Sequence, residues 1–192
     1  MSSTDPVILR TRGLSKEFRG FFAVRNVSLD IRRHTIHALI GPNGAGKTTC
    51  FNLLTTFLPA TAGTIEFNGR DITRSDPARV AGSGLVRSFQ ISAVFGQMSV
   101  LDNVRVALQR KAGGTYAFWR SDRVLQQHNA RAVELLAAVG LERYQTSLAA
   151  DLSYGRKRAL ELATTLALDP ELILLDEPIA GLGHEDIGPV TR

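Results

Sequence analysis

The sequence predicts an α/β fold in which strands and helices alternate at both ends of the chain, with a helical block inserted between them. Two observations support this fold class. A short apolar run, TIHALI at 35–40, ends at a glycine and is followed by a helical pattern. A second apolar run, ELILLDEP at 171–178, ends on two acids and a proline. With 192 residues, 44% of them hydrophobic, the chain can bury the core that such a fold needs.

Strand patterns cover most of the N-terminal part. Two alternating segments, 7–18 and 22–31, are joined at Arg19-Gly20, as in a hairpin. The run at 35–40 is uniformly apolar, which favours a buried strand followed by a glycine turn. Further strands are expected at 63–69, 84–90 and 171–178.

Helical periodicity begins directly after the glycine turn. Cys50, Leu53, Leu54 and Phe57 fall at i, i+3, i+4 and i+7, which places them on one helix face. Pro59 and Gly63 should end this helix. The middle of the chain carries three more helical patterns, at 100–109, at 132–139 before the probable C-cap Gly140, and at 159–166 before Asp169-Pro170.

Charge and cysteine content exclude some classes of protein. The net charge is +5, but the basic residues are scattered in short groups, which is typical of a solvated surface rather than a nucleic-acid site. The single cysteine, Cys50, rules out an internal disulfide and favours a reducing compartment. The longest apolar run, 135–139, is far below the about 18 residues of a membrane span.

The stretch GPNGAGKTTC at 41–50 matches a phosphate-binding loop (P-loop), since Gly41, Gly46, Lys47 and Thr48 stand at the required spacing between a predicted strand and a predicted helix. Glycines let backbone N–H groups converge on an anion, and the helix N-terminus adds its dipole. Lys47 supplies a charge for the β- and γ-phosphates, Thr48 a ligand for Mg²⁺ and Thr49 support for a phosphate oxygen. The predicted ATP-binding residues of the loop are Gly41, Pro42, Asn43, Gly44, Ala45, Gly46, Lys47, Thr48 and Thr49.

The acids at the end of the last predicted strand complete a hydrolytic centre. Ligands of open α/β sheets bind at the carboxyl ends of the strands. Asp176 is expected to help hold Mg²⁺, and the adjacent Glu177 to polarise the water that attacks the γ-phosphate. Without the loop, an acid capping the next helix would be a fair alternative explanation of this pair.

The segment LSYGRKRALELATTLALDPELILLDEP at 152–178 resembles the ATP-binding subunits of ABC transporters. In that family a signature opens the helix that runs into the acidic strand, and here Leu152, Ser153, Tyr154 and Gly155 fill it. Ser153 is a good N-cap, Gly155 permits close approach, and the absence of a capping box leaves the serine hydroxyl free for a ligand. The resemblance implies a head-to-tail dimer in which each signature closes over the ATP of the partner.

Two further positions follow from the resemblance. Phe18 is similar to the aromatic residue that stacks on adenine, with a packing role as the alternative. Gln90 is similar to the glutamine that contacts Mg²⁺ and the attacking water, so Lys47, Gln90 and Glu177 form the implied catalytic set, and Thr48, Gln90 and Asp176 the implied metal set.

Some residues depart from the family pattern. Tyr154 replaces the usual glycine, as in the branched-chain amino acid importer branch, which also has sequence motifs close to GPNGAGKTT and VRSFQ. Arg156 replaces glutamine and is expected to bring positive charge towards the phosphates of the partner's ATP. Gly183 stands where an acid or amide is usual, and no histidine follows at the spacing of the family's switch residue. Because the chain ends just after the acidic strand, where an α/β sheet would normally continue, truncation at the C-terminus is expected.

The resemblance implies a P-loop NTPase (RecA-like) core with an N-terminal antiparallel β subdomain and an inserted α-helical subdomain. One ATP-binding domain would span 1–192, with the insert at about 91–165 carrying the signature. The implied partners are a second ATP-binding subunit, identical or different, integral membrane permeases and, indirectly, a periplasmic solute-binding protein, at the cytoplasmic side of the inner membrane and without nucleic acid. The alternatives are a soluble ABC ATPase acting on nucleic acid or the ribosome, and a nucleotide-binding fragment with little turnover.

Overall fold

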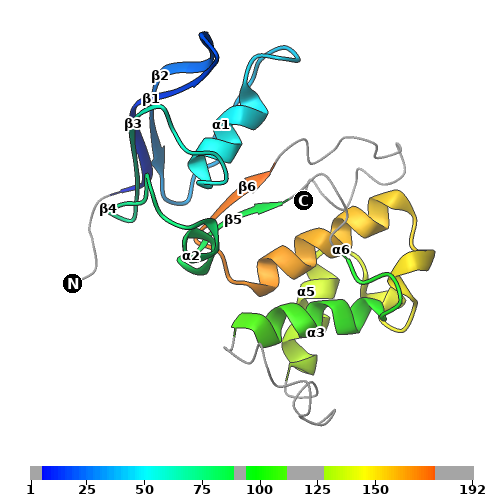
Figure 1. Cartoon of the computed structure of the whole chain (residues 1–192). Helices are drawn as coiled ribbons and strands as arrows, with labels where there is room; N and C mark the ends of the chain where they lie inside the picture. Colours follow the sequence, from blue (N-terminus) through cyan, green and yellow to red (C-terminus); the bar gives the residue numbers. More distant parts are fainter. Residues whose placement is uncertain (1–5, 89–93, 112–127, 176–192) are drawn as a thin grey trace. The chain divides into compact units, whose positions relative to one another are not determined.

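The computed structural model describes residues 6–88, 94–111 and 128–175. The chain divides into two compact units (Figure 1). The first comprises Met1–Arg87 and Glu171–Leu174, and the second comprises Ser88–Pro170 and Leu175–Arg192.

The first unit is built on an antiparallel sheet of four strands in the order β2-β1-β3-β4. Its strands are β1 (Val7–Phe18), β2 (Phe21–Arg32), β3 (Ala62–Phe67) and β4 (Arg70–Asp71). Arg19 and Gly20 both have positive φ, 49° and 89°, and form the two-residue turn between β1 and β2, as the sequence predicts. Two helices, α1 (Lys47–Leu54) and α2 (Pro77–Gly82), and a two-stranded sheet of β5 (Leu85–Ser88) and β6 (Leu172–Leu175), complete the unit.

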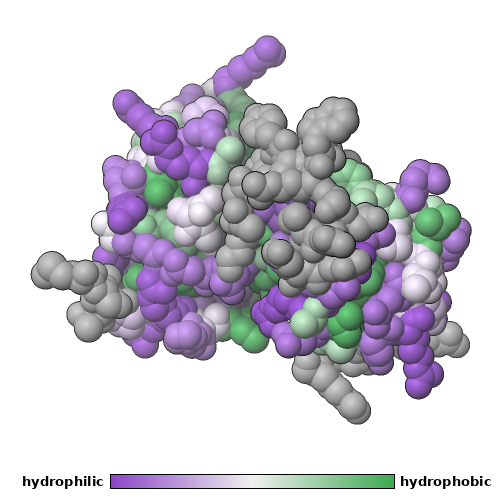
Figure 2. Space-filling view, turned by 90° about the horizontal axis from the view of Figure 1, so that it is seen from below, coloured by the Kyte–Doolittle hydropathy of each residue, from purple (hydrophilic) through white to green (hydrophobic). Residues whose placement is uncertain are grey.

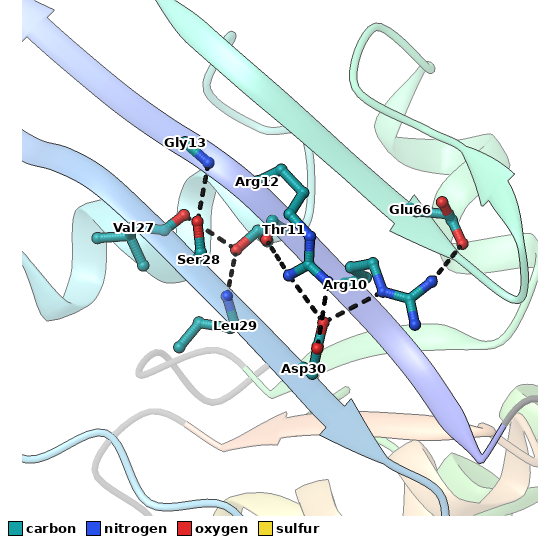
Figure 3. A network of polar contacts seen from close by, with 9 residues as sticks. All are labelled: Arg10, Thr11, Arg12, Gly13, Val27, Ser28, Leu29, Asp30 and Glu66. Carbon is teal, nitrogen blue, oxygen red and sulfur yellow. Dashed lines mark hydrogen bonds and ion pairs between the residues drawn. The ribbon is translucent and has the colours of Figure 1, made fainter.

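The pairing of β1 with β2 is irregular, and buried polar groups compensate for the irregularity. The register shifts between Thr11 and Leu14. Thr11 is fully buried there; its hydroxyl accepts a hydrogen bond from Leu29 N at 3.0 Å and donates one to Val27 O at 3.1 Å (Figure 3). One side chain therefore satisfies two backbone groups beside a point where the ladder is interrupted.

Charged side chains bridge three strands of the same sheet (Figure 3). Asp30 on β2 accepts from Arg10 Nε at 3.2 Å and from Arg12 Nη2 at 3.2 Å, and Arg10 also pairs with Glu66 on β3. The hydrogen bond from Arg12, with a smaller contribution from Arg10, lowers the pKa of the Asp30 carboxyl. Because the group is exposed, this network orders the surface more than it stabilises the fold.

The apolar face of α1 packs against the first sheet. Cys50, Leu53 and Leu54 are buried in one cluster with residues of β1, β2 and β3. The predicted fourth member of that face, Phe57, lies beyond the end of the helix with 56% of its surface exposed. The helix ends earlier than expected because Thr56 adopts a left-handed conformation, φ 59°.

The second unit is helical. It comprises α3 (Val100–Lys111), α5 (Asn129–Ala138), two short 3₁₀ turns (Glu142–Tyr144 and Ala149–Asp151) and α6 (Tyr154–Ala167). Their apolar stripes meet in one core that includes Val104, Leu136 and Leu160. The C-cap of α5 is Val139, and Gly140, predicted as the C-cap, is the next residue, with φ 71°, the left-handed conformation that commonly ends a helix.

The predicted buried strand at 35–40 is wrong. No strand is present in this segment, and Ile36 and Ile40 are 101% and 90% exposed. Within the described part of the chain no strand pairs with it, and a strand without a hydrogen-bonded neighbour has no ladder to hold its geometry. The other predicted strands are confirmed over their described residues, with ends shifted by a few residues.

The face of the molecule in Figure 2 carries mainly hydrophilic side chains, with apolar residues scattered in small groups. Among the helices that the structure describes, none is both long and apolar enough to cross a membrane.

Candidate functional site: a phosphate-binding loop

The loop before α1 has the backbone geometry of an anion site. Gly44 and Gly46 adopt left-handed conformations, φ 82° and 83°, and Ala45 N donates to Pro42 O at 3.2 Å. Gly46 is the N-cap of α1, and no side chain caps the helix. The first helical bond runs from Cys50 N to Gly46 O at 2.8 Å, so the N–H groups of the first turn have no partner within the helix. They are available to an anion, which the helix dipole also favours.

Close contact with β2 fixes the position of this loop. A Cβ atom built on Gly46 would lie 2.2 Å from Ala23 O and 3.6 Å from Val24 Cγ2. A glycine is therefore required at position 46 for two reasons: the backbone there is left-handed, and β2 leaves no room for a side chain.

Lys47, the first residue of α1, spans the loop. Its Nζ donates to Gly41 O at 2.7 Å and to Pro42 O at 2.8 Å. A lysine ammonium has three donors, so one remains for a phosphate oxygen. The sequence predicts the lysine as a phosphate ligand but gives no sign of these two carbonyl acceptors, which only the folded loop brings into range.

The next residues of α1 lie in two environments: some are accessible to a ligand, and one is buried in the core. Thr48 is exposed and Thr49 is half-buried. Cys50 is 4% exposed, and burial raises the pKa of its thiol, which confirms the predicted packing role. The helix is therefore anchored through Cys50 while its first turn stays open.

Phe18 lies at the end of β1 with 45% of its surface exposed. The ring is not part of the buried core, so the alternative role in packing is not what the structure shows. Lys16 Nζ lies 5.2 Å from the ring centroid and donates to Pro59 O at 2.7 Å, so the ring is flanked by a cation that is itself held in place.

The signature residues lie at the start of α6 in the second unit. Ser153 is the N-cap, and its hydroxyl accepts a hydrogen bond from Arg156 N at 3.4 Å. The expectation of a free hydroxyl is therefore corrected in part, since the oxygen caps the helix while its own proton remains to be donated. Leu152 and Gly155 are buried, and Tyr154 is 48% exposed.

Each of the three cations that follow has its own partner. Arg156 lies over the ring of Tyr144, 4.5 Å from its centroid. Lys157 Nζ donates to Ala150 O at 2.8 Å, and Arg158 pairs with Glu161 at 2.6 Å. No acid stands in the first turn of α6. The charge of Arg156 is therefore held beside an aromatic ring, a contact that the sequence did not indicate.

The hydrolytic residues lie at the border of what the structure describes. β6 ends at Leu175, directly before Asp176, and β5 ends at Ser88, two residues before Gln90. Gln90, Asp176, Glu177 and Gly183 themselves lie outside the described residues. Of the predicted metal set, the structure describes Thr48, and the described ranges contain no cluster of three metal-binding side chains.

The comparisons with known proteins agree with this geometry. The family model of the ABC transporter matches residues 24–180. The chain is 40% identical over 187 residues to the high-affinity branched-chain amino acid transport ATP-binding protein LivG of Salmonella typhimurium, and 36% identical to the corresponding protein BraF of Pseudomonas aeruginosa. Each alignment covers 93% of this chain and 72% of the relative.

A solved structure gives the same result for the fold. The ADP conformation of MJ1267, an ATP-binding cassette of an ABC transporter, superposes with a TM-score of 0.79 at 30% identity, over 96% of this chain and 74% of that one. The predicted P-loop NTPase fold is therefore confirmed. The chain belongs to the ATP-binding proteins of the ABC transporter family.

Proposed function

We propose that this protein hydrolyses ATP to drive an ABC importer that takes up branched-chain amino acids or related small solutes. The observation that carries the first half is the loop at 41–46, whose glycine geometry and uncapped helix end form an anion site beside Lys47. The second half is supported by the relatives LivG and BraF, which are named as branched-chain amino acid transport proteins. The two compact units are then parts of one ATP-binding domain.

ATP binding uses groups from two regions of the first unit. The first-turn amides of α1 and the free donor of Lys47 hold the phosphates, and Thr49 supports one phosphate oxygen. The exposed ring of Phe18 stacks on adenine. The groups that bind the two ends of the nucleotide are each held in place: the phosphate loop by its contact with β2, and the ring of Phe18 by the β1–β2 turn.

Hydrolysis uses oxygen donors and a base. Thr48, Gln90 and Asp176 offer hydroxyl, amide and carboxylate oxygens, which are the hard ligands that Mg²⁺ prefers. Mg²⁺, when bound, neutralises charge on the phosphates. Glu177 accepts a proton from the attacking water as the water oxygen bonds to the γ-phosphorus and the bond to the β–γ bridging oxygen breaks. Lys47 offsets the charge that develops on the phosphates.

The signature is proposed to act on a second molecule of ATP. Ser153 keeps a proton to donate, and the first turn of α6 contains no acidic residue that would repel an anion. A helix N-terminus of this kind suits a phosphate, and one nucleotide does not need two such ends. The arrangement therefore calls for a head-to-tail dimer, in which each signature closes over the ATP held by the partner's loop, and for membrane permeases that respond to that closure.

Two experiments test the proposal. Steady-state phosphate release with Mg²⁺ should fall by at least 100-fold in Glu177→Gln, with ATP affinity retained, because the variant lacks a base but keeps the phosphate loop. Hydrolysis at the normal rate in this variant would remove Glu177 from the mechanism. In cells, deletion of the gene should abolish uptake of labelled leucine, isoleucine and valine, and the wild-type gene should restore it. Unchanged uptake of all three would contradict the proposed solute class.

A further inference from the structure

The turn between β1 and β2 carries three exposed phenylalanine rings. Phe18 is 45% exposed, Phe21 69% and Phe22 41%. Single exposed apolar residues are common, but three large rings at one turn call for a role. Neither Phe21 nor Phe22 belongs to the core cluster of this unit.

The strand register decides on which face of the sheet each ring lies. Phe18 pairs directly with Phe21, so these two side chains lie on the same face. Phe22 pairs with Glu17, the neighbour of Phe18, and therefore lies on the opposite face. The cation contacts agree, since Lys16 lies over Phe18 and Arg25 over Phe22, each at 5.2 Å from the ring centroid.

A β-bulge produces this arrangement. Lys16 pairs with Val24, but the next residue, Glu17, pairs with Phe22, so that Ala23 is an extra residue on β2. Simple alternation along β2 would place Phe22 on the face of Val24. The bulge reverses this and places Phe21 there instead.

The face that Phe18 and Phe21 share is the face of the phosphate loop. Val24 is buried with Cys50 and Leu53 of α1. A Cβ on Gly46 would lie 3.6 Å from Val24 Cγ2, which puts the loop next to that side chain. Lys16, opposite Val24, bonds to Pro59 O just beyond α1. Figure 1 shows the β1–β2 turn and the loop leading into α1 at the same end of the unit.

We propose that Phe21 is a second base-binding residue, which forms with Phe18 a two-ring platform for the purine of the bound nucleotide. The inference rests on the proposed ATP binding. Directly paired side chains have Cβ atoms about 4.5–5.5 Å apart, so two phenyl rings can offer a purine more apolar surface than one ring offers. Phe22, on the opposite face, takes no part.

Phe21→Ala and Phe22→Ala form a matched pair, since the residues are adjacent, of the same type and both exposed. Calorimetry should compare the binding of ATP with that of inorganic tripolyphosphate, which has no base. Phe21→Ala should weaken ATP binding about 5- to 50-fold, as expected for loss of a base–aromatic stack, and leave tripolyphosphate binding within about twofold. Phe22→Ala should leave both within about twofold, and Phe21→Trp should retain ATP binding.

The outcomes separate the inference from the function on which it rests. ATP binding of wild-type strength in Phe21→Ala overturns the inference, as does an equal loss in Phe22→Ala. An equal loss of ATP and tripolyphosphate in Phe21→Ala also overturns it, because the defect would then lie in the phosphate loop. If Lys47→Ala leaves ATP binding unchanged, the proposed nucleotide site itself is wrong, whatever Phe21 does.

Discussion

Gly46→Ala tests the contact that holds the phosphate loop against β2. The substitution introduces two penalties of different origin. The φ of 83° places an L-residue in the left-handed region, at about 1–2 kcal/mol. The new Cβ would also lie 2.2 Å from Ala23 O and 3.3 Å from Ala23 C, where atoms in contact need more than 3 Å. One of the two backbone segments must therefore move by about 1 Å. A displacement of that size can lower the activity of a site that depends on exact positioning by about 100-fold.

Gly44→Ala is the matched control for the dihedral penalty. Gly44 has almost the same φ, 82°, but a Cβ built there meets nothing within 4 Å. It carries the left-handed penalty of about 1–2 kcal/mol without the collision. The difference between the two variants therefore isolates the contact with Ala23.

Isothermal calorimetry with ATP and Mg²⁺ measures both variants, with thermal unfolding as the check on folding. Gly44→Ala should bind ATP no more than about 30-fold more weakly than the wild type, and Gly46→Ala about 100-fold or more. If both variants lose the same affinity, the contact between the loop and β2 plays no part, and the glycine is required for its backbone conformation alone.

Three further predictions concern stability and reactivity. In the helical unit, burial raises the pKa of Asp102, but hydrogen bonds from Ser99 and Arg105 outweigh it, so the net pKa is lowered. A carboxylate whose pKa is lowered by folding stabilises the protein at pH values above its unfolded-state pKa, and this stabilisation is lost as the pH falls through the folded-state pKa. Asp102→Asn should therefore lower the free energy of urea unfolding by about 1 kcal/mol at pH 7, and the difference from the wild type should shrink as the pH falls below the ordinary carboxyl pKa. Thr11→Val should cost about 2–4 kcal/mol because two buried backbone groups lose their partner, whereas Thr11→Ser should recover most of that stability; equal loss in both variants would point to packing instead. The Cys50 thiol, buried with a raised pKa, should resist iodoacetamide at pH 8 until the protein is unfolded, and rapid labelling of the native protein would show that α1 opens.

Most helices and strands were predictable from the local spacing of apolar residues, but one predicted strand failed because it lacks a neighbour to pair with. The helices α3, α5 and α6 follow the apolar periodicity, because a helix makes its hydrogen bonds within one segment. The segment at 35–40 has the composition of a buried strand, but a strand needs a partner, and the described chain supplies none. Composition could show that the segment suits a sheet, not which strand would pair with it.

The same distinction holds inside the phosphate loop. The residue types and spacing at 41–48 were enough to predict phosphate binding, because backbone amides, a helix end and a lysine suffice for that chemistry. The carbonyl acceptors of Lys47 and the contact between Gly46 and Ala23 depend on how the loop folds against β2. They could not be predicted, since no local pattern indicates which strand the loop touches.

The hairpin tip shows how one extra residue can change a functional assignment. In the sequence FFAVRNV, alternation from the buried Val24 selects Phe22 as the ring that faces the loop. The register instead pairs Phe22 with Glu17 and Phe21 with Phe18, because Ala23 is bulged. Bulged strands place two residues opposite one, so every side chain beyond the bulge changes face. The bulged residue Ala23 thus has its carbonyl against Gly46 of the phosphate loop, and the same bulge places Phe21 on the face of that loop. In the proposed site, one irregularity of β2 therefore positions groups for both the phosphates and the base.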